Sequence, residues 1–308
     1  MPRPADLSSA LLSAAGSIRK ACAYLALLAL PCATPLAAEP PSDSLPPDVA
    51  RFILANTEFS LMHEMGHMLI IEYDLPVLGR EEDAADQLGF LALFELYSTL
   101  PTAEVDARLL DIADYWRLEW QRPKPVRERV LAWDSHPLDE QRYYNIACLL
   151  YGSDMRRLDW VPELTELPYE RALYCDREFR QARKALDWAS SAYQHKAIQR
   201  RAAIQVTYGQ SSGAIPDFDQ LLAPLLENSN LQRLAEDMVK LFHPPRPLTV
   251  RVMACGAPDA WYNSNIGELT LCYERLAHFR DLAETLPRLQ PPYAWRCPNA
   301  NANTLSAC

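Results

Sequence analysis

Residues 52–73 read Phe-Ile-Leu-Ala-Asn-Thr-Glu-Phe-Ser-Leu-Met-His-Glu-Met-Gly-His-Met-Leu-Ile-Ile-Glu-Tyr, and this apolar run predicts a helix from about Pro47 to Tyr73. His63 and His67 are four residues apart, so a helix places them on one face, where both imidazoles can bind one Zn²⁺. Glu64 projects from an adjacent part of the helix and can take a proton from water at the metal. The H-E-x-x-H spacing therefore predicts amide hydrolysis without a covalent nucleophile.

The alternative for this motif is a partly buried helix with two hydrogen-bonded histidines and a surface glutamate. Apolar residues flank the motif on both sides, from Phe52 to Met62 and from Met68 to Ile71. Burial of two histidines and a carboxylate there would be costly without partners. A metal ion and its water would supply those partners, so the metal site is the favoured interpretation.

A third metal ligand is sought in the acidic stretch at residues 81–86, Glu-Glu-Asp-Ala-Ala-Asp, which opens a second predicted helix after a Pro/Gly turn. A zinc hydrolase needs three protein ligands and an open position for water. We predict Glu82 as the third ligand, with Asp86 hydrogen-bonding a ligand histidine. Glu81, Asp83 and Asp86 remain alternative ligands, and a solvated acidic helix start is the alternative to all of them.

His136 lies in a polar turn, Asp134-Ser135-His136-Pro137, before another predicted helix. It is a candidate catalytic donor to the oxyanion of a tetrahedral intermediate. A structural histidine at a helix start is the alternative, and is the more common role. Tyr262 and Tyr273 could donate in the same way, although such tyrosines more often pack at a sheet edge.

The N-terminal residues 1–38 predict a signal peptide. Arg19 and Lys20 precede an apolar run at 21–30, and small residues precede Glu39, so cleavage is expected after Ala38. An uncleaved anchor and a lipid-modified Cys32 are the alternatives. The sequence thus predicts a bacterial protein exported to the periplasm or secreted, without stable membrane insertion after signal removal. Its net charge of −10 argues against nucleic acid as a partner.

Six cysteines remain after the signal, and an even number in an exported chain suggests three disulfides. Pairing of sequential neighbours closes the shortest loops, which favours Cys148–Cys175, Cys255–Cys272 and Cys297–Cys308. A second zinc site built from thiolates is the alternative, but the chain has no C-x-x-C pair.

The mature chain, residues 39–308, is expected to form one domain. Residues 47–100 would carry the metal-site helices and 101–200 a helical segment, with predicted helices at 101–120, 138–151 and 168–193. Residues 201–308 would form an α/β segment, with strands at 206–208, 248–253 and 268–272 and a turn-rich loop at 256–265. Helices are expected there at 217–226, 230–242 and 273–286. The fold class is therefore α+β, mostly helical, with a small late sheet.

The stretch from His63 to Leu91, HEMGHMLIIEYDLPVLGREEDAADQLGFL, resembles a bacterial family of metallopeptidases known as DUF4344. The resemblance extends to residues 136–154 and to the segment from Cys255 to Glu274. It implies a zincin-like, zinc-dependent metallopeptidase that acts on a peptide or protein substrate.

A second resemblance covers residues 259–271, which are similar to a sheet-edge segment of other zincins. In those enzymes the segment lies above the metal, and the substrate docks on it as an added strand. There it precedes the H-E-x-x-H helix, whereas here it follows, which implies a permuted order of elements.

These observations predict a zinc metallopeptidase in which Zn²⁺ is bound by His63, His67 and Glu82, with Glu64 as general base. The alternative is a zincin-like scaffold or interaction protein that binds the metal but has little or no peptidase activity. The intact Glu64 favours the enzyme, because a metal scaffold needs the histidines and not this glutamate. The sequence does not define the oligomeric state.

Overall fold

The computed structural model describes residues 44–128, 130–131, 133–194, 203–211, 213 and 215–286. The expected signal peptide, its cleavage site and the Cys297–Cys308 pair lie outside these residues. Within the described ranges, none of the helices combines the length and apolarity that a membrane span requires.

Most of the described chain is helical. The longer helices are α2 (Pro47–Tyr73), α3 (Glu81–Leu96), α4 (Thr102–Gln121), α5 (Asp139–Ser153), α8 (Cys175–Gln194), α10 (Leu231–Phe242) and α11 (Tyr273–Ala283). Shorter turns of helix are η1 (Tyr97–Thr99), η2 (Val126–Glu128), α6 (Val161–Leu164), α7 (Tyr169–Ala172), η3 (Phe218–Leu222) and α9 (Ala223–Glu227).

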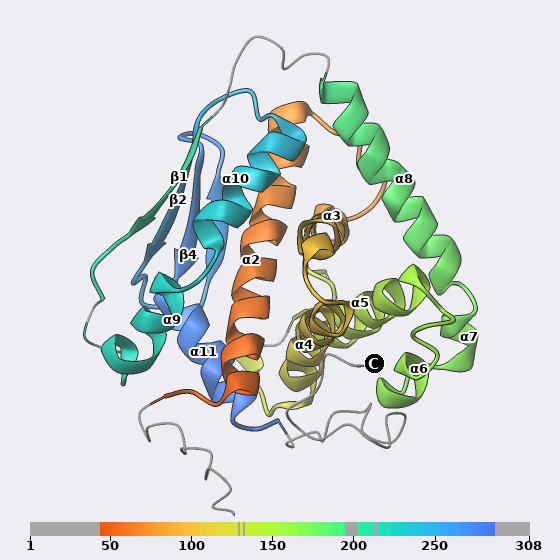
Figure 1. The fold of residues 1–308 in the computed structure, drawn as a ribbon, viewed down its shortest axis with the longest axis horizontal. Coiled ribbons are helices and arrows are strands. Elements are labelled where there is room, and N and C mark those ends of the chain that lie inside the picture. The colour runs from red at the N-terminus through yellow and green to blue at the C-terminus, as the bar shows by residue number, and fades with distance from the viewer. Residues whose placement is uncertain are drawn as a thin grey trace, which may run out of the picture. The chain divides into compact units, whose positions relative to one another are not determined.

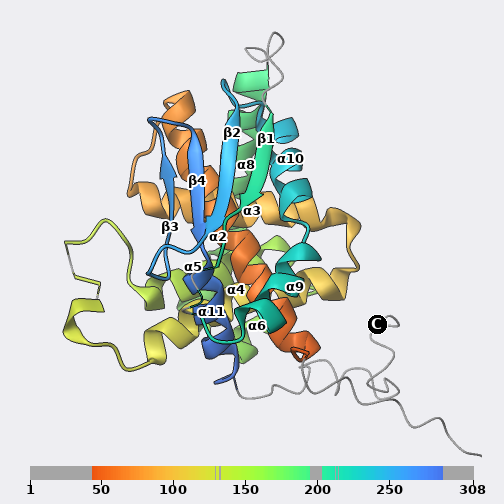
Figure 2. The ribbon, with the colours of Figure 1, turned by 90° about the vertical axis from the view of Figure 1, so that its left-hand side faces the viewer.

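One late sheet accompanies these helices. Its strands are β1 (Ile204–Tyr208), β2 (Leu248–Met253), β3 (Ala260–Asn263) and β4 (Glu268–Cys272), in the spatial order β1-β2-β4-β3. β1, β2 and β4 run parallel, and β3 lies antiparallel at the edge beside β4, as Figure 2 shows. The expected α+β class, mostly helical with a late sheet, is confirmed.

The helix α2 lies between the sheet and the other helices. Figure 1 shows β1, β2, β4, α10 and α11 on one side of it and α3, α4 and α5 on the other. Residues on every side of α2 are buried, which matches a sequence that is apolar all round rather than along one stripe. Pro47 opens the helix, where its fixed φ suits the first position, and Asp74 ends it in a left-handed conformation with φ 51°.

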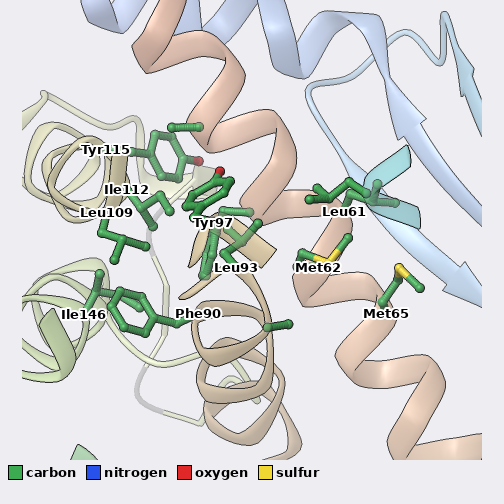
Figure 3. Close-up of a cluster of buried hydrophobic side chains, with 14 of the residues drawn as sticks. Leu61, Met62, Met65, Phe90, Leu93, Tyr97, Leu109, Ile112, Tyr115 and Ile146 are labelled. Carbon is green, nitrogen blue, oxygen red and sulfur yellow. The ribbon is translucent and has the colours of Figure 1, made fainter. Parts of the chain in front are cut away.

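The core continues from α2 through the neighbouring helices. Figure 3 shows part of it, where Phe90 and Leu93 of α3 lie with Leu109 and Ile112 of α4 and Ile146 of α5. On the sheet side, alternate residues of β2 are buried, as expected for a strand with one face on the core, whereas β4 is buried at every position from Leu269 to Cys272. Both halves of the chain thus bury apolar surface against the same helix.

Two glycines allow α2 and α3 to cross at close range. A Cβ added at Gly89 would lie 2.9 Å from the backbone nitrogen of His63, and one at Gly66 would lie 3.0 Å from the Cα of Ala85. The two helices therefore approach most closely at Gly66, Ala85 and Gly89. The backbone that carries His63 rests directly on α3.

Two elements differ from the sequence predictions. The single helix expected at 168–193 is divided into α7 and α8, with a turn at Leu173–Tyr174 between them. α8 begins at Cys175, whose carbonyl oxygen lies so close to Gly152 that an added Cβ there would be 2.2 Å away. The loop expected at 256–265 contains the edge strand β3, which pairs with β4 and lies within the segment 259–271 that resembles a zincin sheet edge.

Two of the expected disulfides are confirmed. Cys148 on α5 is bonded to Cys175 at the start of α8, and Cys255 after β2 is bonded to Cys272 at the end of β4. Glu274 lies beside the second pair and accepts hydrogen bonds from the backbone N–H groups of Cys255 and Gly256. These four cysteines therefore carry no thiolate that could bind a second zinc ion.

We predict that Gly89→Ala destabilises the fold and weakens metal binding. The new Cβ would push against the α2 backbone at His63, and overpacking of this kind typically costs about 1–3 kcal/mol. Chemical unfolding and zinc titration would measure the two effects. Gly79→Ala is the matched control, because nothing lies within 4 Å of a Cβ added there. An equal change for both variants would contradict this account of the helix crossing.

We predict that peptide mapping of the unreduced protein recovers Cys148 linked to Cys175 and Cys255 linked to Cys272. Replacing both Cys148 and Cys175 with Ser should lower stability by about 2–4 kcal/mol, since the bond limits the unfolded chain. Mass spectrometry of the digest and denaturant unfolding are the measurements. Recovery of Cys148 linked to any other cysteine would refute the pairing.

Candidate metal centre

Three side chains from α2 and α3 converge on one point. The Nε2 atoms of His63 and His67 are 3.2 Å apart, and the carboxylate of Glu82 lies 3.3 Å from the first and 3.5 Å from the second. His63 and His67 share a face because they are one helical turn apart, and the close crossing of α3 brings Glu82 to that face. The sequence prediction named these three residues as ligands.

The spacing of these donor atoms fits a tetrahedral zinc ion. Ligand atoms about 2.0–2.1 Å from zinc lie roughly 3.3–3.4 Å from one another in a tetrahedron. The separation of the two Nε2 atoms is near that value. The distances of 3.3 and 3.5 Å run to different oxygens of Glu82, and one ligand atom from each of the three residues lies within 4.8 Å of the others. In addition, Oε2 of Glu82 is buried without a hydrogen-bond partner among the described residues, which is costly unless another group satisfies it. The residues present therefore fit a metal ion.

Carboxylates hold the outer nitrogens of both histidines. Nδ1 of His63 lies 2.8 Å from Oδ1 of Asp86, and Nδ1 of His67 lies 2.7 Å from Oε1 of Glu81. A carboxylate accepts, so each Nδ1 carries a proton, and each Nε2 can then bind a cation in place of a second proton. Asp86 was expected in this role. Glu81, which the sequence left open as a ligand, takes the same role at the second histidine.

The charges around the histidines favour a cation. Burial lowers the pKa of His63, but the carboxylates of Asp86 and Glu82 outweigh it and leave the pKa raised. Burial also lowers the pKa of His67, but the carboxylates of Glu82 and Glu81 outweigh it and raise the pKa to about 9. Burial raises the pKa of Glu82, yet the two histidines bring it well below its ordinary value. The site thus stabilises positive charge strongly.

Glu64 lies beside the three donors without joining them. Its Oε1 is 3.9 Å from Nε2 of His63, and the carboxylate is largely buried. Burial raises the pKa of Glu64, while the neighbouring histidines oppose that shift. A carboxylate with a raised pKa is a stronger base than one in water, which suits proton transfer near neutral pH.

Arg142 on α5 completes the support of His63 and was not foreseen from the sequence. Its Nε donates to Oδ2 of Asp86 at 2.8 Å, and its Nη2 donates to Oδ1 of the same carboxylate. Its guanidinium carbon lies 3.5 Å from the ring centroid of Trp116. Asp86 is therefore held on both sides, by an arginine and by the histidine it orients. No spacing signal could have identified a residue 56 positions away.

The structure brings His136 to the site as well. Its Nε2 lies 3.3 Å from Oε1 of Glu82, its Nδ1 lies 2.9 Å from Oδ1 of Asp134, and about half of its side chain is exposed. The hydroxyls of the other two candidates are engaged elsewhere, Tyr273 with the carbonyl of Gly209 and Tyr262 with Glu72. His136 is thus the candidate donor that reaches the metal centre.

We predict that Asp86→Asn and Arg142→Gln each weaken zinc binding by roughly 10–100-fold, as loss of a group that orients a ligand usually does. Competition with a chelator of known affinity would measure it. Asp106→Asn is the control, because Asp106 is another buried carboxylate paired with an arginine, Arg157, but lies away from the site. That variant should lose stability with zinc affinity unchanged. Comparable zinc loss in all three would contradict the assignment.

Comparison with known proteins points to a protein family. The model of the family DUF4344, described as "Putative metallopeptidase", matches residues 38–190. That range contains the metal-site side chains, the general-base candidate, Arg142 and His136. No curated protein and no solved structure matches the chain at a significant level.

Proposed function

We propose that this chain, a member of the DUF4344 family through its residues 38–190, is a zinc-dependent metallopeptidase. The observation that carries the proposal is the convergence of His63, His67 and Glu82, whose ligand atoms lie within 4.8 Å of one another, with a largely buried Glu64 beside them. This is the arrangement in which metal-assisted amide hydrolysis proceeds without a covalent intermediate.

When bound, zinc would lower the pKa of a water molecule and polarise the scissile carbonyl. Glu64 accepts the proton of the attacking water and then donates it to the leaving amine. His136 donates a hydrogen bond to the oxygen on which negative charge develops. Asp86 and Glu81 keep both histidines in the tautomer that presents Nε2 to the centre.

The edge strand β3 supplies a docking surface for a peptide. It is antiparallel to β4, lies at the end of the sheet order and packs on α2. Tyr262 of β3 and Arg246 both donate to Oε1 of Glu72 near the end of α2, which ties the strand to the metal-site helix. We propose that substrate adds to β3 as a further strand, so that backbone hydrogen bonds supply affinity without strong sequence preference.

We further propose that residues 39–308 form the exported, mature domain, periplasmic or secreted. The two disulfides support this location, because such bonds persist in oxidising compartments. The substrate would then be a peptide or protein outside the cytosol.

We predict that Glu64→Gln keeps the fold and the zinc but loses turnover by about 10²–10⁴-fold, since general acid–base groups contribute that much. Glu82→Gln should instead lose zinc, and activity would fall with the metal. The measurement is zinc occupancy beside the hydrolysis rate on a mixed peptide library for the wild type and both variants.

Each result separates one part of the proposal. A wild-type chain that binds zinc in solution but cleaves no peptide would favour the scaffold function. Full zinc occupancy in Glu82→Gln would overturn the ligand assignment. An unchanged peptidase rate in Glu64→Gln would overturn the mechanism.

A further inference from the structure

Arg275 packs against α2 close to the general base. It is the third residue of α11, directly after β4, and its Nε donates to Oγ of Ser60 at 2.9 Å. Ser60 is one helical turn before Glu64, so the two lie on one face of α2 about 6 Å apart along the axis. The positive charge of Arg275 also lowers the pKa of Glu64, which burial raises.

Arg275 differs from the other arginines that lie between packed helices and strands. Those arginines are paired with carboxylates, as in Arg51–Asp111, Arg108–Glu58, Arg122–Glu119, Arg142–Asp86, Arg157–Asp106 and Arg246–Glu72. In the described part of the chain Arg275 has no ion pair, and its Nε–Ser60 bond is its single hydrogen bond. Its two terminal nitrogens have no partner there and are not sealed from solvent.

The side chain of Arg275 is nonetheless held in place. Its guanidinium carbon lies 5.5 Å from the ring centroid of Phe279 and 6.0 Å from that of Tyr115, within the range of cation–π attraction. With Nε fixed by Ser60, the remaining N–H groups form a preorganised fork. Such a fork fits the two oxygens of a carboxylate, and little rotamer entropy remains to be lost on binding.

The unpaired positive charge of Arg275 matters because the other ionisable groups beside the histidines are mostly acidic. Glu64, Glu81, Glu82 and Asp86 surround the histidines, so an anionic peptide group would be repelled unless a positive charge receives it. The distance of one helical turn from Glu64 corresponds to about two residues of an extended peptide, at roughly 3.3 Å per residue. An anion at Arg275 would therefore belong to the substrate near its scissile bond.

We propose that Arg275 is a specificity-determining residue that binds a carboxylate of the substrate within about two residues of the scissile bond. The carboxylate is either the side chain of Asp or Glu or the free C-terminus of the peptide. This inference rests on the proposed function for the statement that the substrate is cleaved, and on the geometry of Arg275 for the choice of ligand.

The test measures binding, so that it does not depend on catalysis. A short neutral peptide is prepared with Glu or Gln scanned through its positions, each with a C-terminal acid or amide. Affinities are measured for the zinc-loaded Glu64→Gln chain and for the same chain with Arg275→Gln. We expect one Glu position, or the C-terminal acid, to bind about tenfold more tightly than its neutral counterpart, as charged hydrogen bonds do. Arg275→Gln should remove that preference and leave neutral peptides unaffected.

Three further variants serve as controls. Arg233→Gln removes one exposed positive charge from α10 and should leave the preference intact. Ser60→Ala removes the anchor of Nε and should reduce the preference without abolishing it. If Arg275→Gln does not fold, Arg275→Lys keeps the charge but not the fork and should also reduce it.

Absence of any preference for a carboxylate, or a preference that survives Arg275→Gln, would overturn the proposal. So would an equal loss of affinity for charged and neutral peptides, which is what a purely structural arginine would produce. A carboxylate preference in a chain that cleaves no peptide would refute the proposed peptidase function and leave the assignment of Arg275 standing.

Discussion

The close crossing of α2 and α3 is the contact on which the metal centre depends. Gly66 and Gly89 bring the two backbones together, so that carboxylates from the first turns of α3 reach the ring nitrogens of both imidazoles. A helix separation larger by the width of one methyl group would leave Asp86 and Glu82 out of reach of His63. The ligand geometry is therefore a consequence of backbone packing, and the side chains need no unusual extension.

Burial and charge are balanced around this crossing. Glu81, Glu82 and Asp86 contact the two histidines, and the carboxylates of Glu82 and Asp86, which are largely buried, need partners there. Arg142 compensates Asp86, and Trp116 stacks on Arg142, so the second helix pair, α4 and α5, also stabilises the tautomer of His63. The atom left over is Oε2 of Glu82, which points to the centre where a cation would satisfy it.

The sequence predicted the local part of this arrangement and missed the part that depends on distant contacts. Helix α2 was placed from Pro47 to Tyr73, because its apolar run and its start and stop residues are all local signals. Glu82 and Asp86 followed from their spacing of four. Arg142 and Arg275 could not be identified, since each acts on α2 or α3 from far along the chain. The local sequence at 256–265 predicted a loop, and the sheet edge there was indicated only by the resemblance of residues 259–271 to a zincin segment, because the strand β3 depends on its pairing with β4.

The two halves of the described chain contribute different parts of the metal centre and its surroundings. The family match ends at residue 190, after the helices that carry the metal ligands and their partners. The opposite side of α2 is covered by residues 204–283, which also contribute β3 and Arg275. Because α2 is apolar all round, neither half of the described chain can bury it alone. The metal-binding face of α2 and the face that would meet the substrate thus belong to one cooperative structure. The first half of the chain provides the metal ligands, and the later sheet packs against the same helix.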